Sequence, residues 1–266
     1  AGQDGEKINL YDNAGNLVYE YSVPYLVLGV SDDGVILARE PRYKGGSYWI
    51  LKENQIISLP LYPREYWGAP FRGAALWENY VAATWLWGHS TPRSYLALYD
   101  LEGNQLWRAS PGDFTAIHPL GFADNLIVVS VLYPPRVVVY DIWGNKLWSA
   151  TAHGSTRYAN GYVLAGHKIF DRSGNLLLEK PYSWWGRVIA SDTDGEKVAF
   201  VYYHPSRLRT PLLRVYDIGT GELLWEKKYS APPVIPRFFQ NNLVAVYNGG
   251  IDAVSYTHLT LRRRRE

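Results

Sequence analysis

Ten aromatic, basic and imidazole side chains stand in or beside the longer connections of this sequence, where they could recognise a ligand. They are Trp85, Trp87, His89, Arg93, Tyr133, His153, Trp184, Trp185, His204 and Arg207. Aromatic rings bind apolar and sugar surfaces, and a guanidinium binds anionic groups. The set therefore predicts a binding surface for a protein partner, a carbohydrate or an anionic ligand. In the alternative interpretation the rings cover joints between sheets and the arginines pack along them.

The residues that enzymes commonly use are sparse. The chain has no Cys, which excludes thiolate nucleophiles, disulfides and Cys-ligated metal sites. It has no Gly-x-Ser-x-Gly, no His-x-x-x-His and no phosphate-binding glycine loop. Asp192-x-Asp194-Gly195 resembles the start of a calcium loop but lacks its further acidic ligands. We therefore predict no catalytic residue, no metal and no cofactor.

The net charge of +2 depends on the last residues of the chain. Arg262 to Arg265 supply four of the 27 basic residues, and without residues 255–266 the chain has 23 basic and 24 acidic residues. A neutral body argues against nucleic-acid binding. No apolar run approaches the roughly 18–20 residues that cross a bilayer. Residues 254–261 resemble a translated sequencing adapter, so we expect 255–266 to be a non-native tail.

Two further features concern the source of the chain. It opens without Met and has none elsewhere, which suggests a processed protein or a fragment. The absence of Cys and Met and the excess of Arg over Lys fit a heat-adapted protein, whereas 13 Asn argue against one.

A repeat organises the chain. Five segments share an Asp followed by Gly, and four of them continue with Asn: 11–16, 99–104, 140–145, 170–175 and 216–221. A degenerate copy lies at 51–54. Asp12 and Asp217 are separated by five intervals that average 41 residues. A period of about 40–45 residues with strands throughout is typical of β-propeller blades.

The residues around each turn support four-stranded blades. Asp opens a tight turn by accepting backbone hydrogen bonds, and Gly closes it in the left-handed conformation. Trp107 and Trp148 lie seven residues after the Asp, Trp225 lies eight after, and Tyr19 is the counterpart in the first copy. A large side chain at this position can cover the joint to the next blade.

We therefore predict an all-β chain, a β-propeller of four-stranded antiparallel blades. A single domain over 1–254 would contain five complete blades, at about 24–62, 63–111, 112–152, 153–182 and 183–230. Residues 6–23 and 231–254 would be partial blades. We expect 6–23 to pair with 231–247 in a composite sixth blade, because pairing removes exposed strand edges.

The predicted blade order separates two sets of residues. The short turns carry most of the acidic residues, whose expected role is to form the turns. The longer connections carry the ten residues above, further aromatics and basic residues, including Arg39, Arg42, Lys44, Arg64, Tyr66, Trp67, Arg136 and Arg209. Loops on a rigid scaffold are common sites of function, so we place the predicted binding surface there.

Segment 216–225, Tyr-Asp-Ile-Gly-Thr-Gly-Glu-Leu-Leu-Trp, resembles the repeat of quinoprotein-like propellers. The resemblance implies this architecture, whereas the vicinal Cys pair and calcium ligands of quinoprotein dehydrogenases have no counterparts here. Aryl sulfotransferases have similar turns, and His118, His153, and His204 with Arg207 are the possible counterparts of their His and Arg. We predict a non-catalytic binding or assembly scaffold, favoured outside the cytoplasm. The alternative is a propeller enzyme of either kind with part of its site missing.

Overall fold

The computed structural model is an all-β protein, with 26 strands and no helix in the residues it describes. These residues are 2–4, 7–12, 14–22, 26–31, 33–39, 48–53, 55–59, 71–87, 93–110, 117–132, 134–153, 156–180, 187–204, 208–230, 234–239, 242–247 and 250–255. In this part of the chain no helix is long and apolar enough to span a membrane.

Five antiparallel sheets of four strands each confirm the predicted blades. In every sheet, strands that follow one another in the sequence are neighbours. The first two sheets are β4 (Leu26–Val30), β5 (Ile36–Arg39), β6 (Tyr48–Lys52) and β7 (Gln55–Ser58), then β8 (Phe71–Trp77), β9 (Tyr80–Trp87), β10 (Arg93–Asp100) and β11 (Gln105–Ala109). The third is β12 (Ile117–Ala123), β13 (Leu126–Leu132), β14 (Pro135–Asp141) and β15 (Lys146–Thr151).

The last two complete sheets follow the same order. They are β16 (Thr156–Ala159), β17 (Tyr162–Ala165), β18 (Lys168–Phe170) and β19 (Leu176–Glu179), then β20 (Arg187–Thr193), β21 (Lys197–His204), β22 (Leu208–Asp217) and β23 (Leu223–Lys228). This sequential order is what short hairpin turns produce.

Each end of the chain forms a three-stranded sheet, and the pairing of 6–23 with 231–247 stays a prediction. One sheet is β1 (Gly2–Asp4), β2 (Lys7–Tyr11) and β3 (Leu17–Ser22), and the other is β24 (Val234–Phe239), β25 (Asn242–Tyr247) and β26 (Gly250–Ser255). In each, a short local connection supplies the third strand, which costs less chain entropy than long-range pairing. Ser255, expected in the tail, pairs with Asn242.

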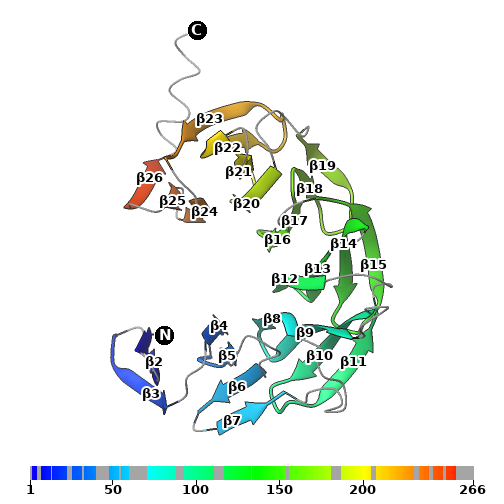
Figure 1. Ribbon diagram of the computed structural model, residues 1–266, viewed down its shortest axis with the longest axis vertical. Coiled ribbons are helices and arrows are strands. Elements are labelled where there is room, and N and C mark those ends of the chain that lie inside the picture. The colour runs from blue at the N-terminus through cyan, green and yellow to red at the C-terminus, as the bar shows by residue number, and fades with distance from the viewer. Residues whose placement is uncertain are drawn as a thin grey trace. The chain divides into compact units, whose positions relative to one another are not determined.

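The chain divides into two compact units. Unit 1 comprises 1–134 and 138–146, and unit 2 comprises 135–137 and 147–266. Figure 1 shows that in unit 2 the first strands of the three sheets, β16, β20 and β24, lie on one side of the unit, and the last strands β19 and β23 lie on the other.

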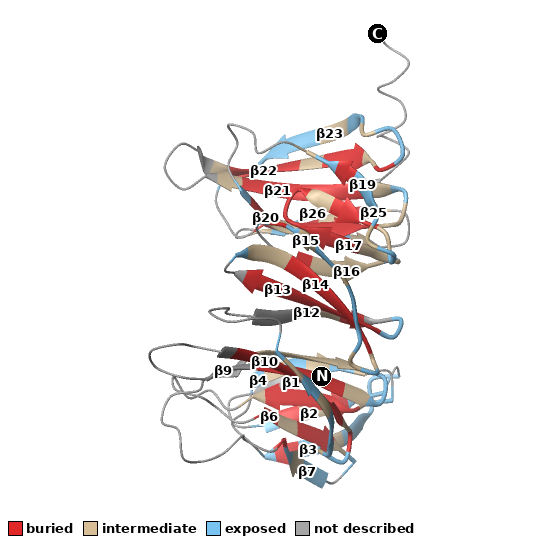
Figure 2. Cartoon of the chain, turned by 90° about the vertical axis from the view of Figure 1, so that its right-hand side faces the viewer, coloured by how far each residue is buried: buried red, intermediate tan, exposed pale blue. Residues whose placement is uncertain are grey.

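Alternation along the strands explains the cores between successive sheets of unit 1. Val81 and Ala83 of β9 join a cluster with Leu37 and Ile50 of the β4–β7 sheet. Ala82, between them, joins a different cluster with side chains of β12–β14. Successive residues of a strand point to opposite faces, so one strand contributes to two cores. Figure 2 shows a similar pattern in unit 2, where β21 and β22 are buried and β23, the last strand of that sheet, is largely exposed.

Asp and Asn build the turn between the third and fourth strands. Asp100 Oδ1 accepts the backbone N–H groups of Glu102 at 3.0 Å and Asn104 at 2.7 Å, and Oδ2 accepts the Asn104 side-chain amide at 2.9 Å. The carboxylates of Asp12, Asp141 and Asp171 make the same three bonds. The side-chain hydrogen bond from Asn16 lowers the pKa of Asp12, and that from Asn175 lowers the pKa of Asp171. These aspartates form turns, as predicted.

Candidate functional site

Four of the ten residues proposed for the binding surface lie at described strand ends. Trp85 and Trp87 are in β9, Arg93 begins β10, and His204 ends β21. Arg93 pairs with Trp87 in the backbone register, and Tyr95 pairs with Trp85. The backbone therefore brings two of the predicted tryptophans beside the predicted arginine, at the end of the β9–β10 hairpin away from the Asp100 turn.

The other candidates are less well defined. His153 is exposed in the connection after β15. His118, from the alternative enzyme reading, pairs with Ser130 in the β12–β13 ladder. The remaining candidates lie outside the described residues: His89, Tyr133, Trp184, Trp185 and Arg207. The convergence of all ten on one surface stays a prediction.

The residue seven positions after the turn Asp joins one sheet to the next, as the sequence predicts. In unit 1, Trp107 Nε1 donates to the Ile142 carbonyl at 2.6 Å. The indole lies over Gly144, where an added Cβ would be 3.0 Å from the Trp107 ring, and Gly144 has φ +91°. In unit 2, Trp148 Nε1 donates to the Arg172 carbonyl at 2.9 Å and its ring covers Gly174 in the same way.

At the joint between the β1–β3 sheet and the β4–β7 sheet, tyrosine takes the place of tryptophan. The predicted residue is Tyr19, but Tyr21 makes the hydrogen bond across the joint. The Tyr21 hydroxyl donates to the Glu53 carbonyl at 3.0 Å. Glu53 occupies the degenerate turn and has φ +48°. Tyr19 packs against the same core, and the two ring centroids are 6.3 Å apart. Burial raises the pKa of Tyr21.

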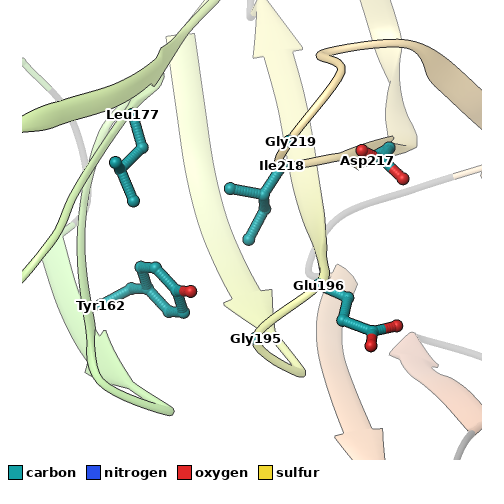
Figure 3. Close-up of a pocket in the computed structure, with 7 residues that line it drawn as sticks. All are labelled: Tyr162, Leu177, Gly195, Glu196, Asp217, Ile218 and Gly219. Carbon is teal, nitrogen blue, oxygen red and sulfur yellow. The ribbon is translucent and has the colours of Figure 1, made fainter.

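At the joint between the β16–β19 sheet and the β20–β23 sheet, the position seven residues after the turn Asp is a leucine. Leu178 stands seven residues after Asp171. Lys180 Nζ donates to the Gly221 carbonyl and lies 4.6 Å from the Tyr216 ring centroid, where it makes a cation–π contact. A pocket of about 530 Å³ opens beside them, lined by Tyr162, Leu177, Gly195, Glu196, Asp217, Ile218 and Gly219 (Figure 3).

Asp192 has a role that the sequence did not indicate. It lies on β20 with 3% of its surface exposed, so it differs from the acidic residues that are expected from the sequence to form turns. Its Oδ2 accepts the Phe238 backbone N–H of β24 at 2.9 Å, and its Oδ1 lies 3.4 Å from Arg157 Nη2 of β16. One carboxylate thus connects three successive sheets of unit 2. Both bonds bridge residues far apart in sequence, so no local motif could reveal them.

Asp194 behaves as the sequence predicts and forms its turn. Its Oδ1 accepts the Glu196 and Lys197 backbone N–H groups at 2.9 and 2.6 Å. Asp192 and Asp194 therefore bind different partners. Over the described ranges, no group of three His, Asp or Glu side chains is placed to hold a metal ion.

His167 is a buried imidazole at the β17–β18 turn. Its Nε2 lies 3.5 Å from Glu179 Oε1, and Lys168 Nζ is 3.4 Å from the same oxygen. The preceding Gly166 has φ +61°, and a Cβ there would overlap the His153 carbonyl oxygen. The backbone at residue 166 lies so close to the His153 carbonyl that only glycine, which has no Cβ, fits the short connection between β17 and β18. Burial lowers the pKa of His167, and the effect exceeds the opposing influence of Glu179.

The lowered pKa of His167 predicts a pH-dependent stability. Because the folded pKa lies below the unfolded value of about 6.5, its stabilising contribution is complete above that value. The contribution is lost as the pH falls through the folded pKa. Between pH 7.5 and 5, we expect the unfolding free energy of His167→Gln to fall less than that of the wild type. The two slopes should differ by at most about 1.4 kcal/mol per pH unit, the value for one proton. Urea denaturation at successive pH values measures this. An unchanged slope in His167→Gln would contradict the assignment.

Comparison with known proteins identifies the fold class. No family model and no curated protein matches the sequence. Solved structures do match: Hsv2 of Kluyveromyces marxianus has a TM-score of 0.59 at 13% identity, covering 94% of this chain and 86% of that chain. The Dos1 propeller gives 0.58 at 15% identity, covering 94% and 72%. The WD40 domain of Toxoplasma gondii coronin gives 0.54 at 11% identity, covering 85% and 66%. The chain has a β-propeller fold.

Proposed function

We propose that this chain is a non-catalytic binding or assembly scaffold that recognises a protein partner through its longer connections. The observation that carries the proposal is the β9–β10 register, in which Arg93 is opposite Trp87 and Tyr95 is opposite Trp85. Directly paired residues of antiparallel strands share one face of the sheet. Tryptophan, tyrosine and arginine are the residue types that dominate the energetics of protein interfaces.

The fold is consistent with this role and does not establish it. A β-propeller, such as the WD40 domain of coronin, presents loops on a rigid frame. The same fold can support many different functions. A carbohydrate or an anionic ligand would use the same rings and guanidinium groups. The quinoprotein-like relationship and a location outside the cytoplasm remain part of the proposal.

Partner capture with matched variants tests the proposed surface. The chain is immobilised, and proteins retained from an extract of its source are quantified for wild type, Trp85→Ala, Arg207→Ala and Glu102→Ala. We expect a partner whose retention falls about tenfold in the first two variants, because each removes a side chain of the type that dominates interfaces. Glu102 lies in the Asp100 turn at the other end of the sheet, so its variant should bind normally.

Two controls make the result decisive. Thermal unfolding must be unchanged in the variants, so that lost binding is not lost folding. Equal retention by all variants, or a loss confined to Glu102→Ala, would contradict the proposed surface. Sulfate transfer from p-nitrophenyl sulfate that requires His204 would instead support the enzyme alternative.

A further inference from the structure

The pocket in unit 2 lies where a tryptophan fills the corresponding joint of unit 1. In unit 1, Trp107 packs with Tyr80 and Ile142 against one core. Tyr80 begins the second strand of its sheet, and Ile142 follows the turn Asp141 of the next sheet. In unit 2 the same places are held by Tyr162, which begins β17, and Ile218, which follows Asp217. Leu178 stands in the place of Trp107.

Leucine is shorter than tryptophan and cannot form the same bond. Leu178 covers Gly221, with its Cδ1 3.3 Å from an added Cβ there, as Trp148 covers Gly174. It has no N–H to match the bond from Trp107 to the Ile142 carbonyl. The corresponding acceptor is the carbonyl of Ile218. This residue is held in place by its own N–H, which donates to the Glu196 carbonyl at 2.8 Å.

The walls of the pocket suit a flat aromatic ring. Tyr162 and Leu177 from one sheet face Ile218 from the next across the open space (Figure 3). The carboxylates of Glu196 and Asp217 point away from this apolar slot and lie at its rim. Glu196 and Asp194 lie 3.4 and 3.7 Å from Lys197 Nζ, and Lys180 Nζ lies nearby at the Gly221 carbonyl. The carboxylates of Asp194, Glu196 and Asp217 thus stand against the two lysines, which leaves an excess of negative charge around the pocket.

We propose that this pocket binds a tryptophan side chain of a protein partner, carried in a basic segment. The indole ring fills the space between Tyr162, Leu177 and Ile218, and its N–H donates to the Ile218 carbonyl, as Trp107 does to Ile142. Charge complementarity with Glu196 and Asp217 favours lysine or arginine on either side of the tryptophan. The site lies at the turns and uses none of the loop residues in the proposed binding surface, so either site can fail without the other.

Titration with short peptides tests the pocket directly. The probes are acetyl-Lys-Trp-Lys-amide, the matched peptide with alanine in place of tryptophan, and the matched peptide with glutamate in place of both lysines. Binding is followed by NMR shifts of the Tyr162 and Ile218 signals. We expect saturable binding of the first probe and binding at least about tenfold weaker for each of the others. No saturation by the first probe at millimolar concentration would overturn the proposal.

Two variants are designed to fill or narrow the pocket with side chains of the chain itself. Leu178→Trp should place an indole in the slot from within the chain, which abolishes peptide binding and raises Tm by about 2–4 °C for each kcal/mol gained. Gly219→Val narrows the slot from the other side. An added Cβ at Gly219 meets only Asp217 Oδ1 at 3.5 Å, so folding should be preserved if Leu178→Trp misfolds. Unchanged peptide affinity in a folded variant of either kind would place the peptide elsewhere and overturn the proposal.

Discussion

Replacing Asp192 by alanine should lower the free energy of unfolding by about 3–5 kcal/mol, the range for removing one partner of a buried ion pair. The carboxylate is buried, and it serves both the Phe238 N–H and the Arg157 guanidinium. Its loss leaves a donor unsatisfied and a partly buried cation without its counter-charge. Urea denaturation followed by far-ultraviolet circular dichroism measures the change.

Two related variants separate the causes of that loss. Asp192→Asn keeps an oxygen for the Phe238 N–H but removes the charge, so we expect a smaller destabilisation than for alanine. Asp194→Ala removes a half-buried turn carboxylate two residues away and should cost about 1 kcal/mol. Equal effects of Asp192→Ala and Asp194→Ala would show that Asp192 does not connect the sheets.

Trp148→Ala should lower the free energy of unfolding by about 3 kcal/mol, at the low end of the range for Trp-to-Ala because its ring is half-buried. The change removes the bond to the Arg172 carbonyl, the cover over Gly174 and the contact with Phe170, whose ring centroid is 5.4 Å away. Trp107→Ala should have a similar effect in unit 1. The same denaturation experiment applies.

Trp143 provides a control within the same repeat. It sits in the Asp141 turn with 71% of its surface exposed, so Trp143→Ala should change the unfolding free energy by less than about 0.5 kcal/mol. Comparable losses for Trp143→Ala and Trp148→Ala would mean that the position seven residues after the turn Asp has no special role in joining the sheets.

The features that sequence predicts well are local and repeated. The Asp100 turn follows from bonds within five residues, and the copies at Asp12, Asp141 and Asp171 repeat it. Trp107 and Trp148 could be predicted because they recur at a fixed distance from those turns. Tyr21 was missed because its partner, Glu53, belongs to a degenerate turn.

Features that depend on distant parts of the chain were not predictable. Asp192 resembles its neighbour Asp194 in sequence, yet its partner is a backbone N–H 46 residues away. One repeat carries Leu178 where two others carry tryptophan, and the pocket at this joint takes its lining from two different sheets. The terminal strands β2 and β25 have the additional local partners β1 and β26, which carry no copy of the repeated turn.

Hydrogen–deuterium exchange with the captured partner tests the proposed binding surface most directly. We expect amides in residues 84–95, at the loop end of the β9–β10 hairpin, to exchange several-fold more slowly in the complex. Amides in residues 99–106, at the turn end of the same sheet, should exchange at the same rate with and without partner. Slower exchange confined to 99–106, with 84–95 unchanged, would contradict recognition through the connections that carry Trp85, Trp87 and Arg93.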